Sequence, residues 1–159
     1  MEKGDKCLAV VRVRGVVNVR KDINDALKML HLVRNCHATL IDNRPSYMGM
    51  LQKVHNYVTW GEVSKEIIAL LLRKRGKLVG DRRITDEYAK RIGFESIEDL
   101  AEAIYNLKVE FHKLPDIKPV FRLHPPSGGY DGSVKKSYRS EGVVGYRGKA
   151  INDLLKKMI

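Results

Sequence analysis

The chain has 159 residues, and 43% of them are hydrophobic, which is enough for one domain with a buried core and an appendage. Its net charge of +11 favours a polyanionic partner, with nucleic acid before an anionic membrane. No apolar run approaches a membrane-spanning length and the N-terminus has no signal-peptide pattern, so we expect a cytoplasmic protein without a membrane partner. Two cysteines, Cys7 and Cys36, are too few for a disulfide framework and are expected to be reduced thiols.

The first part of the chain alternates between strand and helix patterns. Residues 8–14 place Val11 and Val13 on one face of a predicted strand and Arg12 and Arg14 on the other. The next elements expected are a helix capped by Asp22, a strand at 38–42, a helix from about Ser46 and a strand at 57–60. Three strands and two helices pack most simply as a two-layer α+β core, with both helices on one sheet face. The other face would stay open, and its arginines would offer a platform for RNA.

The second part of the chain changes to helical patterns and ends in an amphipathic segment. Ser64, Thr85 and Ser96 each precede such a pattern and are expected as N-caps, and Gly76 is expected to end the first of these helices. The last segment, 149–158, carries an apolar stripe that should dock on the body. We therefore divide the chain into a core at 1–62, a helical extension at 63–115, and a basic Gly/Pro-rich loop segment with a C-terminal helix at 116–159.

The segment 118–149 combines high positive charge with little to bury. It holds seven Lys and Arg against two acids, and six of the chain's thirteen glycines. Burial cannot offset the ordering entropy of such a segment, so we expect an external polyanion to order it. Tyr130, Tyr138 and Tyr146 each have a cation within a few positions, which suits phosphates and unstacked bases. The alternatives are a solvated, partly disordered tail, or tyrosines that pack on the body.

A second basic cluster lies at 73–83, where six cations and one acid stand between two helical patterns. We expect these cations to contact one phosphate backbone, and we favour this over a basic helix end that only interacts favourably with the helix macrodipole.

The sequence does not support an enzyme. The five histidines lack H-E-x-x-H spacing, and no phosphate-binding loop, dinucleotide fingerprint or G-x-S-x-G motif occurs. We predict no catalytic residue, metal, cofactor or small-molecule substrate.

Several sequence blocks carry a family resemblance that extends over the full chain. They are Ala9-Val-Val-Arg-Val-Arg-Gly15, Asn18-Val19, residues 27–32, Pro45 with Gly49-Met-Leu51, Lys53-Val54, Tyr57-Val-Thr-Trp-Gly-Glu62, and Gly128-Gly-Tyr130 with Gly142 and Gly148. With these blocks the chain resembles a universal family of large-subunit ribosomal proteins, numbered thirty in bacterial and archaeal naming and seven in eukaryotes. Residues 63–159 resemble the longer archaeal and eukaryotic form, without the basic N-terminal extension of the eukaryotic members.

The resemblance implies a three-stranded antiparallel sheet with two helices, related to the ferredoxin-like fold. It also implies a structural, non-catalytic role in clamping large-subunit ribosomal RNA (rRNA) beside neighbouring ribosomal proteins. The rRNA-binding residues expected from the resemblance and from the charge pattern are Arg12, Arg14, Asn18, Arg20, Lys21, Arg44, Tyr47, Lys53, Arg73, Lys74, Arg75, Lys77, Arg82, Arg83, Arg122, His124, Tyr130, Lys135, Lys136, Tyr138, Arg139, Arg147 and Lys149.

Two other functions remain open at this point. The first is a free RNA chaperone or single-strand RNA-binding module, which would need aromatic residues inside the strands, and residues 10–14 have none. The second is a helix-turn-helix DNA regulator built from the helical extension. Its third helix would be acidic, and this charge would repel a DNA groove.

Overall fold

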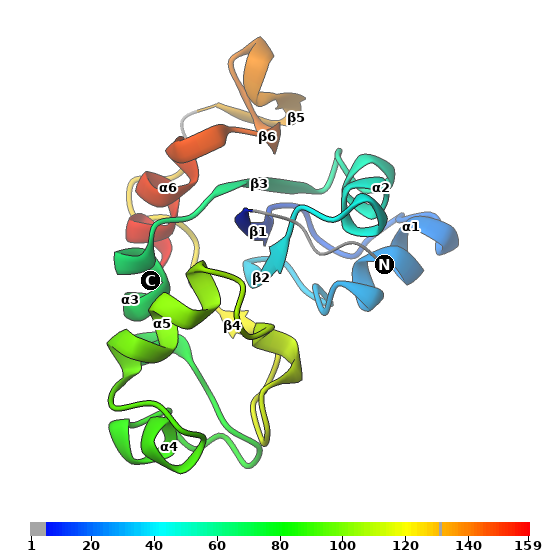
Figure 1. The fold of residues 1–159 in the computed structure, drawn as a ribbon. Coiled ribbons are helices and arrows are strands. Elements are labelled where there is room, and N and C mark those ends of the chain that lie inside the picture. Colours follow the sequence, from blue (N-terminus) through cyan, green and yellow to red (C-terminus); the bar gives the residue numbers. More distant parts are fainter. Residues whose placement is uncertain (1–5, 131) are drawn as a thin grey trace.

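The computed structural model describes residues 6–130 and 132–159 (Figure 1). Residues 1–5, on which the signal-peptide prediction partly rests, and Asp131 lie outside the described residues. The predicted α+β class is confirmed. The core elements are β1 (Cys7–Arg12), α1 (Lys21–Met29), β2 (His37–Asp42), α2 (Pro45–Lys53) and β3 (Val58–Glu62). One local prediction is wrong: α1 starts at Lys21 after Arg20, so Asp22 lies in the first turn and does not cap the helix.

The sheet is larger than the three strands predicted. Its order within the described residues is β4-β2-β1-β3-β6-β5, in which β4 is Phe121–Arg122, β5 is Ser133–Ser137 and β6 is Gly142–Tyr146. The central strand β1 pairs antiparallel with β2 and β3, and Val10 lies opposite both Thr39 and Trp60. β4 is added beside β2, and β6 is added parallel to β3. The third segment of the chain therefore shares a sheet with the first, while the division at residues 62 and 115 stays a prediction.

The rest of the chain adds four helices close to where the sequence predicts them. These are α3 (Lys65–Arg75), α4 (Asp86–Arg91), α5 (Ile97–Tyr105) and α6 (Ile151–Met158), with 3-10 turns η1 (Phe111–Lys113), η2 (Tyr138–Ser140) and η3 (Gly148–Ala150). The side chains of Ser64, Thr85 and Ser96 each accept a hydrogen bond from the backbone N–H three residues later, which confirms the three N-caps. No helix of the described residues combines the length and the apolar character that crossing a membrane requires.

Helices cover both faces of the sheet, so the open face predicted for the core is wrong. Leu8 and Val10 of β1 pack with α1 and α2, whereas Ala9 and Val11 pack with α3, α5 and α6. Figure 1 shows the sheet between these two groups of helices. The cause lies in β1, which is apolar at five consecutive positions from Cys7 to Val11 and is buried throughout. A continuous apolar run is typical of strands buried on both faces.

The segment 118–149 is ordered partly by the protein itself. β4 and β6 join the sheet, and Val143 and Val144 are 2% exposed in the core. The expectation that only an external polyanion orders this segment is therefore wrong for its two ends. By contrast, β5 and η2 between them are exposed almost throughout.

A close backbone contact holds the C-terminal part against β3. A Cβ atom on Gly61 would lie 1.9 Å from the carbonyl oxygen of Gly148, a distance no real contact allows. Arg147 N–H also donates to the carbonyl of Trp60 at 2.9 Å. Only glycine at position 61 lets η3 and α6 approach the strand this closely.

We predict that Gly61→Ala releases η3 and α6 from β3. The variant should lower the free energy of unfolding by about 2 kcal/mol or more, because the backbone must shift to remove the overlap. Chemical denaturation followed by circular dichroism measures the change. Gly49→Ala is the matched control, since Gly49 lies inside α2 with nothing within 4 Å of the added methyl group. It should be neutral or stabilising, and equal losses in the two variants would contradict the explanation.

Candidate nucleic-acid interface

The predicted RNA-binding residues lie mainly on three separate surfaces. The first, the core surface, holds Arg14, Asn18, Arg20, Lys21, Arg44, Tyr47 and Lys53 on α1, α2 and the loop before α1. The second, the α3–α4 surface, holds Arg73, Lys74, Arg75, Lys77, Arg82, Arg83 and Arg122. The third, the β5 arm, holds Lys135, Lys136, Tyr138 and Arg139. Figure 1 shows β5 at the top of the molecule, α4 at the bottom, and α1 and α2 on one side.

Arg12 belongs to none of these surfaces because its side chain is fully buried. Its guanidinium donates to the carbonyls of Leu32 and Val33 at 2.8 and 3.1 Å, and to those of Arg14 and Gly15 at 2.9 and 3.1 Å. The expectation that Arg12 points towards an open face is therefore wrong. Arg12 instead joins the loop after β1 to the loop before β2, and it holds both loops in place.

The loop that Arg12 holds carries the exposed part of the core surface. Arg14 lies over the ring of Tyr57, with its guanidinium carbon 5.1 Å from the ring centroid. Val16 and Val17 are 55% and 80% exposed, and Asn18 has a positive φ of 58° at the tip. Exposed valines in a loop of this charge can contact the sugar and base faces of RNA, while the cations around them meet phosphates.

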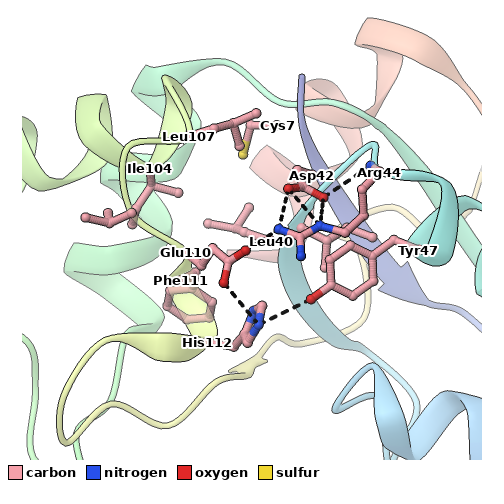
Figure 2. A pocket seen from close by; sticks show the side chains of 12 residues that line it. Cys7, Leu40, Asp42, Arg44, Tyr47, Ile104, Leu107, Glu110, Phe111 and His112 are labelled. Atoms are coloured by element: carbon pink, nitrogen blue, oxygen red, sulfur yellow. Dashed lines mark hydrogen bonds and ion pairs between the residues drawn. The ribbon is translucent and has the colours of Figure 1, made fainter. Parts of the chain in front are cut away.

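Arg44 and Tyr47 enter a polar cluster between the core and the extension. Figure 2 shows Arg44 between Asp42 and Glu110, with Tyr47 directed at His112. Arg44 Nε lies 2.8 Å from Asp42 Oδ1, Arg44 Nη2 also bonds Glu110, and Tyr47 Oη lies 3.2 Å from His112 Nε2. Only 13% of the Arg44 side chain is exposed. This arginine therefore joins α2 to η1 and is poorly placed for a phosphate.

The charges of this cluster are balanced internally. The bond from Lys113, followed by that from Arg44, lowers the pKa of Glu110 below its ordinary value of 4.5. Hydrogen bonding to Asp42 raises the pKa of Arg44, and burial lowers the pKa of His112. An ionised Arg44–Asp42–Glu110 group beside a neutral imidazole is therefore the stable state at neutral pH.

On the α3–α4 surface, part of the charge is paired and part is not. Arg73 pairs with Glu98 and lies 3.8 Å from Asp86, and Arg122 lies 3.6 Å from Asp81. Lys74, Arg82 and Arg83 are exposed and have no acidic partner among the described residues. Arg75 Nη1 lies 3.4 Å from the carbonyl of Arg122, so these two cations are neighbours across 47 positions.

The β5 arm presents its cations on an exposed strand. Lys135, Lys136 and Arg139 are exposed and form no ion pair within the described part of the chain. Arg147 anchors the base of the arm, because its Nε donates to Thr59 Oγ1 at 2.8 Å and its Nη2 to the carbonyl of Val143 at 2.7 Å. Its guanidinium carbon also lies 4.9 Å from the ring centroid of Tyr138.

Three predicted residues lie between or behind the surfaces. Tyr130 packs against the core, where burial raises the pKa of its hydroxyl, so this tyrosine follows the alternative of packing on the body. His124 Nε2 lies 3.1 Å from the backbone oxygen of Ile159, so this histidine holds the C-terminal residue against the segment after β4. Lys149 is exposed in η3, outside the three surfaces.

Sequence reasoning missed the acidic partners of these cations. Arg44 and Glu110 are 66 positions apart, and Arg73 and Glu98 are 25 apart. No local pattern signals such pairs, because they depend on how the extension lies against the core. One such pair could have been predicted from the sequence: Asp42 and Arg44 lie two positions apart at the end of a strand.

Comparison with known proteins defines the class. The sequence profile of the family described as "Ribosomal protein L30p/L7e" matches residues 8–58, which run from β1 to the first residue of β3. This is a class of ribosomal proteins and not of enzymes, in agreement with the sequence analysis.

Relatives that carry the extension make the assignment specific. "Large ribosomal subunit protein uL30" of Methanopyrus kandleri is 53% identical over 92% of this chain and 100% of the relative. The proteins of the same name from Archaeoglobus fulgidus and Thermofilum pendens are 50% and 45% identical, each over 94% of this chain and 98% and 97% of the relative. The chain therefore belongs to the uL30 family of large-subunit ribosomal proteins, in its archaeal long form.

We predict that Arg12→Met strongly destabilises the fold. Four backbone carbonyls lose their donor, and the cost should be about 3 kcal/mol or more in the free energy of unfolding. Arg14→Met is the control, because this neighbouring arginine is partly exposed, and its loss should cost below about 1 kcal/mol. Urea denaturation of both variants measures the difference. A small effect of Arg12→Met would show that the buried guanidinium does not hold the two loops.

We also predict that Glu110 contributes to the acid sensitivity of the fold. A carboxylate with a pKa lowered by folding stabilises the fold above its unfolded-state pKa, and this contribution disappears as the pH falls through the folded-state value. Glu110→Gln should therefore be less stable than the wild type at neutral pH, and should lose less stability between about pH 5 and pH 3. Urea denaturation across this range measures both effects.

Glu102→Gln provides the control for the acid experiment. Glu102 is exposed on α5 and forms no ion pair among the described residues, so its variant should follow the pH response of the wild type. If the Glu110 variant also follows the wild type, the cluster of Figure 2 makes no pH-dependent contribution.

Proposed function

We propose that this chain is a structural constituent of the large ribosomal subunit in the cytoplasm, where it binds and stabilises large-subunit rRNA beside neighbouring ribosomal proteins. The observation that carries the proposal is the separation of paired from unpaired cations. Arg12, Arg44 and Arg147 are used inside the protein, whereas exposed cations without acidic partners among the described residues remain on each of the three surfaces. Those cations are available to phosphates.

A rigid body with three basic surfaces suits a clamp on folded RNA. The cations of β5 lie at one edge of the sheet, and Arg122 of the α3–α4 surface lies on β4 at the other edge. Each surface can neutralise the phosphates of a different RNA segment, and the sheet fixes the distance between them. Such contacts position RNA without reading its sequence, which is the requirement for a structural ribosomal protein.

The core surface adds contacts of a different kind. Exposed valines beside Arg14, Arg20 and Lys21 combine apolar surface with positive charge on one loop. The four hydrogen bonds of Arg12 preorganise this loop, so little conformational entropy is lost when RNA binds. In this proposal Arg12 acts as a positioning residue and contacts no phosphate itself.

The arrangement disfavours the alternative functions. A single-strand binder of the recognition-motif type uses an open sheet face with exposed aromatic residues, but helices cover both faces here and Trp60 is 3% exposed. A helix-turn-helix regulator would place a helix in a DNA groove. The exposed positions of α5 include Glu98 and Glu102, which would repel DNA phosphates.

We predict that rRNA binding falls steeply with salt and that the β5 arm accounts for part of this slope. A set of about six to ten phosphate contacts loses about a thousandfold in affinity between about 50 and 200 mM salt. Replacing Lys135, Lys136 and Arg139 by glutamine should lower the slope of log affinity against log salt by about 2 to 3. The melting temperature should stay unchanged, because these side chains are exposed. Filter binding to deproteinised large-subunit rRNA measures the slope.

The matched control removes the same charge elsewhere. Lys65, Lys90 and Lys108 are exposed near the acidic positions of α3, α4 and α5, and their replacement by glutamine should leave the slope unchanged. Equal slopes for both triple variants would show that net charge, and not the β5 arm, determines binding. Failure of the wild-type protein to co-sediment with large subunits at low salt would overturn the proposed function itself.

A further inference from the structure

A groove outside the three basic surfaces combines exposed aromatic rings with lysines. It lies where the start of β1 and the end of β3 meet the end of α5 and the start of α6 (Figure 1), and it has a volume of about 660 Å³. This volume is within the range of small-ligand sites. We call it the tyrosine groove and define it by Lys6, Glu62, Tyr105, Asn106, Tyr146 and Lys149. The core, the helical extension and the C-terminal segment all contribute to it.

Tyr146 is held in a fixed position although 43% of it is exposed. Its hydroxyl donates to the carboxylate of Glu62, with Oη 2.5 and 2.7 Å from the two oxygens. Its ring centroid lies 6.4 Å from that of Trp60 below it. An exposed ring that is already oriented loses little entropy when another flat group stacks on it. Tyr146 therefore provides a preorganised stacking surface.

Tyr105 supplies a second exposed ring at the last position of α5. It is also 43% exposed, and neither its side chain nor that of Asn106 has a hydrogen-bond or ring partner among the described residues. An exposed aromatic ring and a free amide side by side suit a ligand that has both a flat face and a polar edge. A nucleobase has both.

The charges of the groove fit a phosphate beside the base. Lys149 is exposed and has no acidic partner among residues 6–130 and 132–159. Lys6 is 59% exposed at the side chain and lies 3.9 Å from Glu62, whose carboxylate already accepts the hydroxyl of Tyr146. Two lysines and two exposed tyrosines thus line the same groove. Cys7 and Val63, the apolar residues of the lining, are only 5% and 2% exposed.

We propose that the tyrosine groove holds one unpaired nucleotide extruded from large-subunit rRNA. The base stacks on Tyr146 and Tyr105, the Asn106 amide bonds the base edge, and the 5′-phosphate lies against Lys149 and Lys6. This inference rests on the proposed function and adds to it a site for a single-stranded residue. An apolar peptide segment is a poorer occupant, because Cys7 and Val63 are buried and the exposed rings are bordered by charged and amide side chains.

Ultraviolet crosslinking of the full chain bound to deproteinised large-subunit rRNA tests the site directly. After nuclease and protease digestion, mass spectrometry should find a single-nucleotide adduct on Tyr105 or Tyr146, because stacked bases crosslink to the ring they contact. Adducts confined to the β5 arm and the core surface, with none in the groove, would overturn the proposal. The same experiment on large subunits should give the same adduct, and a crosslinked peptide from a neighbouring protein there would overturn it too.

Two substitutions at one position separate stacking from other effects. Tyr105→Ala should weaken rRNA binding by about five- to a hundredfold, the loss expected for one stacked base. Tyr105→Phe keeps the ring and should bind within about threefold of the wild type. Because Tyr105 is exposed and unpartnered, neither change should alter the melting temperature. Equal affinities of the alanine and phenylalanine variants would contradict stacking at this position.

The salt dependence distinguishes failure of this site from failure of the proposed function. Tyr105→Ala removes no charge, so it should lower affinity while leaving the slope of log affinity against log salt unchanged. Lys149→Gln should instead lower the slope by about 1. If the wild-type chain binds rRNA with a steep slope but neither variant differs from it, only the groove proposal fails. If the wild type does not bind rRNA at all, the proposed function fails first.

Discussion

The burial of β1 on both faces is the constraint on which the rest of the structure depends. Its run from Cys7 to Val11 has no polar position, and the helices α1 and α2 can cover only one side of it. The second side remains unstable in water until α3, α5 and α6 pack on it, each buried side chain contributing about 1.5 to 3 kcal/mol. These helices therefore complete the burial of β1, and the basic residues around them are displayed on the frame that the sheet provides.

The packing of helices on both faces of the sheet determines which cations remain exposed for a partner. A buried guanidinium is tolerated only when its donors are satisfied, and Arg12 meets this condition with four carbonyls. The guanidinium groups of Arg44 and Arg147 are likewise bonded to carboxylates, a hydroxyl and a carbonyl of other elements. Positive charge in the sequence is thus a poor measure of the charge a polyanion meets. Lys74, Lys135, Lys136 and Lys149 are exposed and have no acidic partner among the described residues, whereas Arg12, Arg44 and Arg147 serve as connectors, as the fork geometry of arginine favours.

Local signals predicted the elements well and their spatial relations poorly. The caps Ser64, Thr85 and Ser96, the apolar stripe of α6 and the three core strands follow from side-chain chemistry within a few positions, and all are found in the structure. The strands β4, β5 and β6 were not predicted, because these short strands gain their stability from pairing with neighbouring strands and not from their own pattern. For the same reason the Gly/Pro-rich composition of 118–149 suggested more disorder than the sheet permits. The hydrogen bond from Tyr146 to Glu62 joins residues 84 positions apart, and no periodicity in the sequence predicts it.

The division of the last segment into ordered ends and an exposed middle has a functional consequence. Because β4 pairs with β2 and β6 pairs with β3, the β5 arm is held by a paired strand on each side of it in the chain. An anchored arm samples far fewer conformations than a free tail of equal length, so its cations would lose less entropy on binding the proposed RNA partner. The anchoring at β6 also orients Tyr146 and places Lys149 three residues after it, so the same strand pairing that holds the arm forms one wall of the tyrosine groove. The anchored cations of the arm and the oriented ring of Tyr146 therefore both depend on the pairing of β6 with β3 at the edge of the core sheet.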